Sequence, residues 1–265
     1  MAKKKKRSWE DQKVELAEEV WEPIAPGVER FRLPGNEPVR RIITGRRNGK
    51  VGGFYSWKML AHVAHESDGE EWCARVLDVH PAVTAFFGQP ETLRIEVEGQ
   101  KQPERYTPDF LAFFGEYPVR LEFKWRSELQ PPKPQRKDDE RGWLIWRKAA
   151  KMRRHLRIAS DAYHRAGLIW KLVTDDRLAA MADRETVDEI VRNGGRPIEP
   201  TDLQKLIARL MRSPDEGAPL SECEDLLATA DFPRGDILAR VQERVIAIDL
   251  QRPIMPSTHI HLIRG

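Results

Sequence analysis

Hydrophobic and polar residues alternate along several short stretches in the first two thirds of the chain. Residues 93–98 and 119–124 alternate with period two, which is typical of half-buried strands, and residues 106–114 lie between them. A turn at residues 115–118 separates the last two stretches. We therefore expect a three-stranded meander here, with a further apolar strand at residues 168–173.

The segment before this meander has a different pattern. Residues 1–39 are charged and interrupted by prolines, which predicts a basic N-terminal arm with one short helix near residues 10–19. Residues 40–50 are again basic and contain glycine. Apolar residues at helical spacing begin at Ser56, so we expect a helix to start there.

Two stronger helical patterns surround the meander. One covers Asp68–Val79 and ends at His80-Pro81, because the residue before a proline disfavours helical backbone. The other is a strongly basic helix over residues 143–166. Helices, a meander, a helix and a strand in this order predict an α/β domain over residues 40–176, with a mixed central sheet flanked by helices.

Residues 177–265 read as a second domain. A helix over 178–193 precedes a glycine- and proline-containing break at 194–197. Three further helices and two apolar strands follow, at 201–211 with Thr201 as N-cap, 221–228, 235–243, 245–250 and 258–262. Three helices and a terminal hairpin indicate a winged helix-turn-helix domain.

Charge changes this picture by suggesting a partner. The chain has 265 residues, of which 33% are charged and 40% hydrophobic, as in a soluble globular protein. The net charge is only +3, but positive charge is concentrated at Lys3–Arg7 and in the basic helix. We expect the helix to contact the phosphates of double-stranded DNA through Arg147, Lys148, Lys151, Arg153, Arg154 and Arg157. A solvated tail and a solvated helix face would give the same pattern.

Other features limit where the protein acts. Cys73 and Cys223 are far apart and match no zinc or redox spacing, so we expect packing thiols in a reducing compartment. We find no apolar stretch typical of a signal peptide, and no run that approaches the ~20 apolar residues of a membrane helix. The sequence therefore predicts a cytoplasmic protein that does not insert into a membrane.

The meander also carries charge where a buried sheet should not. Glu122 and Lys124 lie on one face of a strand, and Asp109 lies on the neighbouring strand after Pro108. If the hairpin pairs in register, the two carboxylates converge on a site for Mg²⁺, for which Mn²⁺ can substitute. A lysine beside them can hold an attacking water or stabilise charge on a phosphate. This is the PD-(D/E)xK nuclease pattern, and the alternative is an exposed cross-strand ion pair.

A further acid lies on the helix that precedes the meander. Glu70 is at the margin of the apolar stripe of that helix, whereas Glu71 faces nearly the opposite way. Ser67 and Glu70 also form a capping-box sequence, so Glu70 has a structural explanation as well as a catalytic one. Glu66 and Glu71 stay open as alternatives for the acidic position.

Short motifs follow one another along this domain: Gly53–Lys58, Glu66–Glu70, His80–Val83, Phe87–Pro90, Tyr106–Phe110 and Glu122–Lys124. In this order, over about residues 40–176, they resemble the TnsA family of transposon endonucleases. The resemblance implies a restriction-endonuclease-like fold with Glu70, Asp109 and Glu122 as acids and metal ligands and Lys124 as the catalytic lysine. Gln89 matches a Gln-Pro element with a supporting role. The C-terminal domain resembles the second domain of that family more weakly.

The same resemblance implies a function. The chain would be the Mg²⁺-dependent endonuclease subunit of a heteromeric transposase, cutting the 5′ ends of a transposon beside a DDE transposase. A regulatory AAA+ ATPase would be a partner of the C-terminal domain. Two alternatives stay open: a stand-alone restriction or repair nuclease of the same fold, and a DNA-binding adaptor with a vestigial site.

Overall fold

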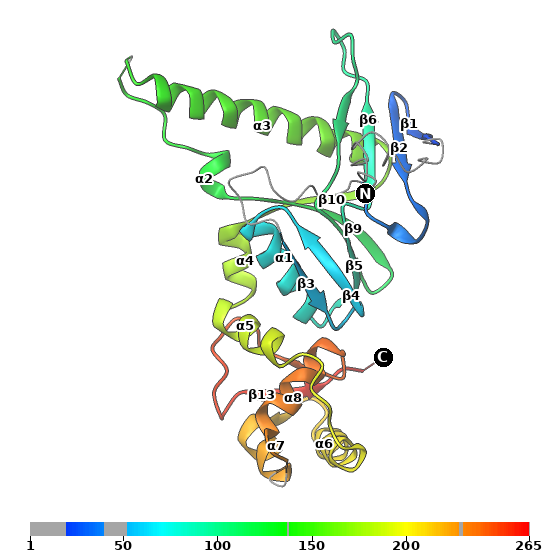
Figure 1. The fold of residues 1–265 in the computed structure, drawn as a ribbon, viewed down its shortest axis with the longest axis vertical. Coiled ribbons are helices and arrows are strands. Elements are labelled where there is room, and N and C mark those ends of the chain that lie inside the picture. Colours follow the sequence, from blue (N-terminus) through cyan, green and yellow to red (C-terminus); the bar gives the residue numbers. More distant parts are fainter. Residues whose placement is uncertain (1–19, 40–51, 137, 228–229, 265) are drawn as a thin grey trace, which may run out of the picture.

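The computed structural model describes residues 20–39, 52–136, 138–227 and 230–264. Within these ranges the chain is a mixed α/β fold with four small sheets and eight α-helices (Figure 1). The expected helix near residues 10–19, the Lys3–Arg7 run and the basic segment 40–50 lie outside the described residues.

The largest helix and one four-stranded sheet organise the N-terminal part. This central sheet has the order β10–β9–β8–β5, built from Ile169–Thr174, Tyr117–Lys124, Phe110–Phe114 and Val83–Gly88. β8 and β9 form an antiparallel hairpin whose turn contains Gly115 at a φ of 63°. β10 instead runs parallel to β9, because the chain crosses over through α2 (Arg126–Leu129) and α3 (Glu140–Arg165).

The expected three-stranded meander is wrong, because the chain changes sheets in its middle. A second sheet has the order β1–β2–β6–β7, built from Glu22–Ala25, Val28–Arg32, Glu91–Ile95 and Glu104–Tyr106. The expected strand 106–114 therefore divides at residues 107–109, between β7 and β8. Pro108 has no N–H to donate to a ladder, and the Asp109 side chain instead accepts a hydrogen bond from the backbone N–H of Phe123 at 2.8 Å.

Two further expectations about the N-terminal part are also wrong. The predicted arm contains β1 and β2 and a 3₁₀ turn at Pro34–Asn36, and Val28 is fully buried in a core. Ser56 ends strand β3 (Gly52–Ser56) instead of starting a helix, and β4 (Ala61–His65) pairs with β3. The turn between them is held by the Met59 N–H, which donates to Ser56 Oγ at 3.0 Å.

Helices cover both faces of the central sheet. On one face lies α1 (Asp68–Val79), which has the predicted bounds, together with α4 (Asp175–Met181). On the other face α3 packs through its buried residues Leu156, Ala159 and Tyr163 against Leu93 and Tyr106 of the second sheet. The N-terminal half of α3 extends beyond the central sheet (Figure 1).

The C-terminal part lies at the opposite end of the molecule from α3 (Figure 1). It contains α5 (Arg184–Asn193), α6 (Pro200–Arg212), α7 (Leu220–Leu226) and α8 (Pro233–Gln242). Strands β11 (Ala218–Pro219), β12 (Ile246–Ile248) and β13 (His259–Leu262) form a sheet of order β11–β13–β12.

Two details of this part differ from the sequence expectation. The single helix predicted over 178–193 is two helices, because Ala182 is extended and Asp183 caps α5 by accepting the Thr186 N–H at 2.9 Å. Thr201 is not an N-cap, since α6 begins one residue earlier with Pro200 and its N-cap is Glu199. Proline suits the first helical position because its missing N–H would have no intrahelical partner.

Helix α8 joins the C-terminal part to the rest of the molecule. Most of its residues are buried, including the polar Asp236, Arg240 and Gln242. The Gln242 side-chain amide donates to Asp78 Oδ2 on α1, and one apolar cluster continues from the central sheet through α1 into α5–α8. The domain boundary at residues 176/177 stays a prediction, and no gap in the core marks it.

Both cysteines, Cys73 and Cys223, are free and buried, as plain packing thiols would be. Burial raises the pKa of each thiol, to about 11 for Cys223, which keeps it protonated near neutrality. Among the helices of the described residues, none is both long enough and apolar enough to cross a membrane.

Candidate functional site

The hairpin of β8 and β9 brings together three of the predicted site residues, Asp109, Glu122 and Lys124. Phe110 pairs with Leu121, so one further step of the same register places Asp109 opposite Glu122. Lys124 Nζ lies 2.7 Å from Glu122 Oε1 and 3.7 Å from Asp109 Oδ2. The side chains of Asp109, Glu122 and Lys124 are 14%, 7% and 22% exposed, so the cluster is largely withdrawn from solvent.

The Lys124 ammonium lies among oxygen atoms. Besides the two carboxylates, it donates a hydrogen bond to the backbone carbonyl of Phe123 at 2.8 Å. Mg²⁺ is bound by oxygen atoms such as those of carboxylates and carbonyls. The Lys124 ammonium lies at the point where two carboxylates and one carbonyl meet. The donor chemistry at this point therefore fits a hard divalent cation.

The electrostatics of the cluster favour added positive charge. Burial raises the pKa of Asp109 well above its ordinary value, and the charge of Glu122 raises it further, while Lys124 acts in the opposite direction. Burial alone would lower the pKa of Lys124, but Asp109 and Glu122 outweigh it and the pKa is raised. The raised pKa means that the Asp109 carboxyl gains from binding positive charge, whether a proton or a cation.

Glu70 adds to this charge from the first turn of α1. Its negative charge acts on the pKa of both Asp109 and Lys124. The same residue forms the predicted cap: its N–H donates to Ser67 Oγ at 3.2 Å, and its carboxylate accepts from the Ser67 hydroxyl at 3.1 Å and the Glu66 N–H at 2.7 Å. Glu70 therefore lies near the cluster while its oxygens are held by the helix end.

Gly69 explains how α1 comes so close to β9. A Cβ added to Gly69 would lie only 1.9 Å from Cε1 of the Phe123 ring. Since Phe123 stands between Glu122 and Lys124, glycine here lets the first turn of α1 rest directly on the strand that carries the site. Within Ser67–Glu70, Gly69 is thus required for packing, while Ser67 and Glu70 cap the helix.

The two alternatives to Glu70 are placed differently. Glu71 is held by Arg75 at 2.5 Å, and Arg75 also contacts Asp188 of α5 at 2.9 Å. The backbone N–H of Glu66 caps α1 through Glu70, as described above. Of the three glutamates, Glu70 is the one whose charge acts on both Asp109 and Lys124.

Sequence reasoning missed Tyr106. Its hydroxyl donates to Glu122 Oε2 at 2.6 Å and accepts a hydrogen bond from Trp170 Nε1 at 2.8 Å. One oxygen of Glu122 is thereby fixed by Tyr106 and the other by Lys124. No pattern in the sequence reveals this contact, because Tyr106 belongs to β7 in the other sheet and Trp170 arrives only with β10.

Gln89 supports Asp109 through the main chain. Its N–H donates to the Asp109 carbonyl at 2.9 Å, and its own carbonyl accepts from the Val39 N–H at 2.9 Å. Gln89 is buried, and its backbone is left-handed with a φ of 47°. The predicted supporting role is therefore compatible with a structural link that fixes the segment before β8.

The basic residues of α3 divide into two groups. Arg147, Lys148, Lys151 and Arg157 are exposed, whereas Arg153 is partly buried and donates to the Leu129 carbonyl. Arg154 is exposed and pairs with Glu104 at 3.2 Å. Four of the six residues predicted to contact phosphates therefore form an exposed group on α3. The other two, Arg153 and Arg154, bond to residues outside this helix.

No metal site is assembled in advance within the described residues, where no three His, Cys, Asp or Glu side chains are grouped closely enough to hold an ion. The structure brings Asp109 and Glu122 together around Lys124 but does not add Glu70 as a third ligand. The oxygen atoms that meet at Lys124 are those of Asp109, Glu122 and the Phe123 carbonyl.

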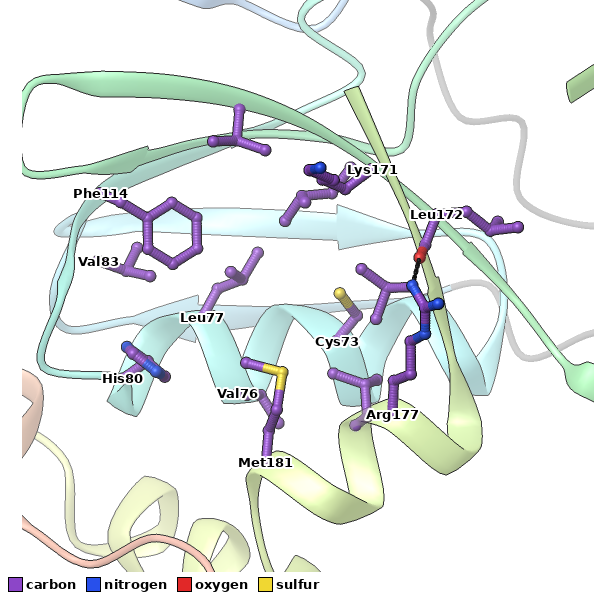
Figure 2. A pocket seen from close by; sticks show the side chains of 14 residues that line it. Cys73, Val76, Leu77, His80, Val83, Phe114, Lys171, Leu172, Arg177 and Met181 are labelled. Atoms are coloured by element: carbon purple, nitrogen blue, oxygen red, sulfur yellow. Dashed lines mark hydrogen bonds between the residues drawn. The ribbon is translucent and has the colours of Figure 1, made fainter. Parts of the chain in front are cut away.

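A separate cavity of about 330 Å³ lies behind the central sheet, between α1 and α4 (Figure 2). Its walls are apolar apart from His80, Lys171 and Arg177, and Arg177 donates to the Leu172 carbonyl at 3.1 Å. Leu121 faces this cavity, whereas Glu122 is directed to the other face of the sheet. The cavity therefore does not contribute to the carboxylate–lysine cluster.

Comparisons with known proteins add no assignment. A scan against models of protein families gives no match to this chain, and a search of curated proteins gives none either. What the chain does is therefore inferred from its own side chains.

Proposed function

We propose that the protein is a metal-dependent DNA endonuclease with a PD-(D/E)xK site. The observation that supports this most is the convergence of Asp109, Glu122 and the Phe123 carbonyl on Lys124 at the end of a hairpin. A cross-strand ion pair alone would not need a second, buried carboxylate of raised pKa beside it. The site would act on a polyanion that approaches along the exposed basic face of α3.

Asp109, Glu122 and the Phe123 carbonyl would hold Mg²⁺ or Mn²⁺, and Glu70 would add negative charge near the ion. When bound, the ion would neutralise charge that develops on the phosphate. Lys124 would then orient an attacking water and stabilise the phosphate oxygens, and Tyr106 would keep Glu122 in place. The water oxygen bonds to phosphorus and the bond from phosphorus to the 3′ oxygen breaks, leaving a 3′-hydroxyl and a 5′-phosphate.

The ordered motifs from Gly53 to Lys124 resemble those of transposon endonucleases. We therefore prefer transposon-end DNA as the substrate. In this proposal residues 40–176 form a restriction-endonuclease-like domain that cuts the 5′ ends of a transposon. A DDE transposase would act as the partner subunit on the 3′ ends, in the cytoplasm. A stand-alone nuclease of the same fold is the alternative within the enzyme class.

We also propose a winged-helix domain for the C-terminal part. The order α6, β11, α7, α8, β12 and β13, with β11 and β12 on either side of β13, supports this topology. In such domains the second helix of the helix-turn-helix reads the major groove, and here that helix is α8. Because α8 is enclosed by α5 and α1, we assign this domain to protein contacts, such as a regulatory ATPase, in preference to reading bases with α8.

One observation favours a non-catalytic adaptor. Lys124 occupies the oxygen set itself, and the described residues contain no preformed three-acid site. An adaptor would bind DNA through α3 without cutting it.

Nicking of supercoiled plasmid in Mg²⁺ or Mn²⁺ separates these functions. We expect wild-type protein to nick, and Asp109→Ala and Lys124→Ala to abolish nicking while both variants stay folded. Equal nicking by all three proteins would contradict the assigned site. If none nicks, the partner transposase and transposon-end DNA are added, and continued absence of cleavage would leave the adaptor as the function.

A further inference from the structure

A second pocket opens beside Glu122 and has no role in the proposed chemistry. Its volume is about 420 Å³, within the range of about 300–1,000 Å³ that is usual for small-molecule sites. Tyr106 and Glu122 line one side, and Thr107 lies two residues before Asp109. The pocket is therefore contiguous with the carboxylate–lysine cluster, since Glu122 belongs to both.

The rest of the lining is largely aromatic and cationic. Trp21 and Phe31 lie with their ring centroids 5.7 Å apart, and the guanidinium groups of Arg94 and Arg105 lie 4.0 and 5.6 Å from the Trp21 ring. Arg105 is exposed on β7, next to Tyr106. Aromatic rings and a planar guanidinium are the groups on which proteins stack flat heterocycles.

The polar groups of the pocket limit the charge of its occupant. The lining holds one carboxylate, Glu122, and one guanidinium, Arg105, so these two charges balance and select neither an anion nor a cation. The hydroxyls of Thr92 and Thr107 both line the pocket and are hydrogen-bonded to each other at 2.7 Å, which leaves acceptor lone pairs for an occupant. A neutral, flat group with polar edges fits this set of walls better than either a phosphate or a purely aliphatic side chain.

We propose that this pocket receives an unstacked nucleobase of the substrate strand, next to the phosphate that is cut. The inference rests on the proposed function, which brings a DNA strand past Glu122. Base stacking in the pocket would fix the strand relative to Asp109 and Lys124, while the phosphates on either side would be held by exposed basic residues.

The test compares two single strands of equal length, a labelled oligothymidylate and an abasic oligonucleotide with the same phosphates. Binding is measured by fluorescence anisotropy without divalent metal, so that neither strand is cut. We expect wild-type protein to bind the oligothymidylate about tenfold more tightly. Trp21→Ala should remove most of this preference and leave the affinity for the abasic strand unchanged.

Arg105→Gln is the second variant, because its exposed position on β7 makes it safe for folding, and it should reduce the preference about threefold. Phe232→Ala is the matched control: Phe232 is exposed in the C-terminal part and also lies under an arginine, Arg196, at 4.6 Å. Its substitution should change neither affinity. Thermal unfolding of each variant checks that its fold is retained.

Equal affinity of wild-type protein for the two strands would overturn the inference, as would full preference in both pocket variants. If plasmid is nicked and no base preference exists, only the pocket assignment is wrong, and a side chain of a partner protein becomes its occupant. If neither strand binds and no plasmid is nicked, the proposed function and this inference both fail.

Discussion

Two partly buried lysines, Lys124 and Lys58, have contrasting surroundings. Lys124 donates to the Phe123 carbonyl and lies between the carboxylates of Glu122 and Asp109. Lys58 donates to the carbonyls of Leu77 and His80, at 2.7 and 2.9 Å, at the C-terminal end of α1. Both amino groups donate to backbone carbonyls, but Lys124 also lies between two carboxylates.

The pKa values differ accordingly. The carboxylates raise the pKa of Lys124, whereas burial lowers that of Lys58 to about 7, with Arg244 adding to the effect and Asp78 only partly opposing it. Lys58 donates to carbonyls at the C-terminal end of α1, where the helix dipole attracts a cation, but burial outweighs this attraction in its pKa. Two carboxyl groups beside the amine, more than burial of a lysine, distinguish the candidate reaction centre from the structural contact.

Replacing each lysine by methionine tests whether the two lysines have these different roles. Lys124→Met should lower the nicking rate by at least about 100-fold, because the charge opposite the phosphate is lost. Lys58→Met should keep the rate within about twofold per folded molecule, since it acts on helix α1 and not on the phosphate. Rates are normalised to the folded fraction measured by circular dichroism, and comparable losses in both variants would refute the distinction.

The second prediction concerns the approach of α1 to the strand that carries Lys124. Gly69→Ala should lower the free energy of unfolding by about 1–3 kcal/mol, because the added methyl group overlaps the Phe123 ring. Gly88→Ala is the control, since a Cβ there meets its nearest neighbour at an ordinary 3.5 Å. Denaturant unfolding of the two variants measures the difference, and equal stabilities would mean that α1 does not depend on this close contact.

Tyr106→Phe sharpens the comparison by removing the hydroxyl that holds Glu122, and with it the acceptor of Trp170 Nε1. We expect nicking to fall roughly tenfold and the half-saturating Mg²⁺ concentration to rise, because residues that orient metal ligands commonly contribute 10–100-fold. Higher Mg²⁺ should restore part of the rate. Tyr117→Phe, at an exposed position in the hairpin turn, should leave both quantities unchanged; an unchanged Mg²⁺ dependence in Tyr106→Phe would remove Tyr106 from the site.

The last prediction concerns the pH dependence of stability that Lys58 causes. Its folded-state pKa of about 7 is below the ordinary value of 10.5, so between these two pH values the unfolded chain binds a proton that the folded protein does not. Stability relative to Lys58→Met should therefore rise with pH across this window, by at most about 1.4 kcal/mol per pH unit. Denaturant titrations between these pH values give the slope, and parallel curves for the two proteins would show that Lys58 stays charged throughout.

The local parts of the site could be predicted from the sequence. Asp109, Glu122 and Lys124 meet because a hairpin register is set over a few residues and side chains alternate with period two. The cap at Ser67 is equally local. Its hydroxyl accepts the Glu70 N–H as predicted, although the Glu70 carboxylate returns to the Ser67 hydroxyl and the Glu66 N–H and not to the Ser67 N–H. Such features depend on neighbours in the chain, which the sequence displays directly.

Contacts between distant segments could not be predicted in this way. Nothing in the alternation of residues 106–114 shows that Pro108 divides the segment between two sheets and leaves Tyr106 beside Glu122. The burial of Gln242 is also hidden, because a polar residue in a helix reads as exposed until its partner, Asp78 on α1, is known. Both contacts form between segments that are distant in the sequence. Such tertiary contacts override the local preferences of a segment for strand or helix and for exposure.

The parallel pairing of β10 with β9 has a consequence for how the protein is made. The hairpin of β8 and β9 closes locally, so the two carboxylates and Lys124 can come together early in folding. The outer edge of β9 is covered only after α3 and β10 have left the ribosome, through residue 174. Until then the newly made chain exposes the unpaired edge of β9. At this stage we expect it to be most prone to pair with another chain and to need a chaperone.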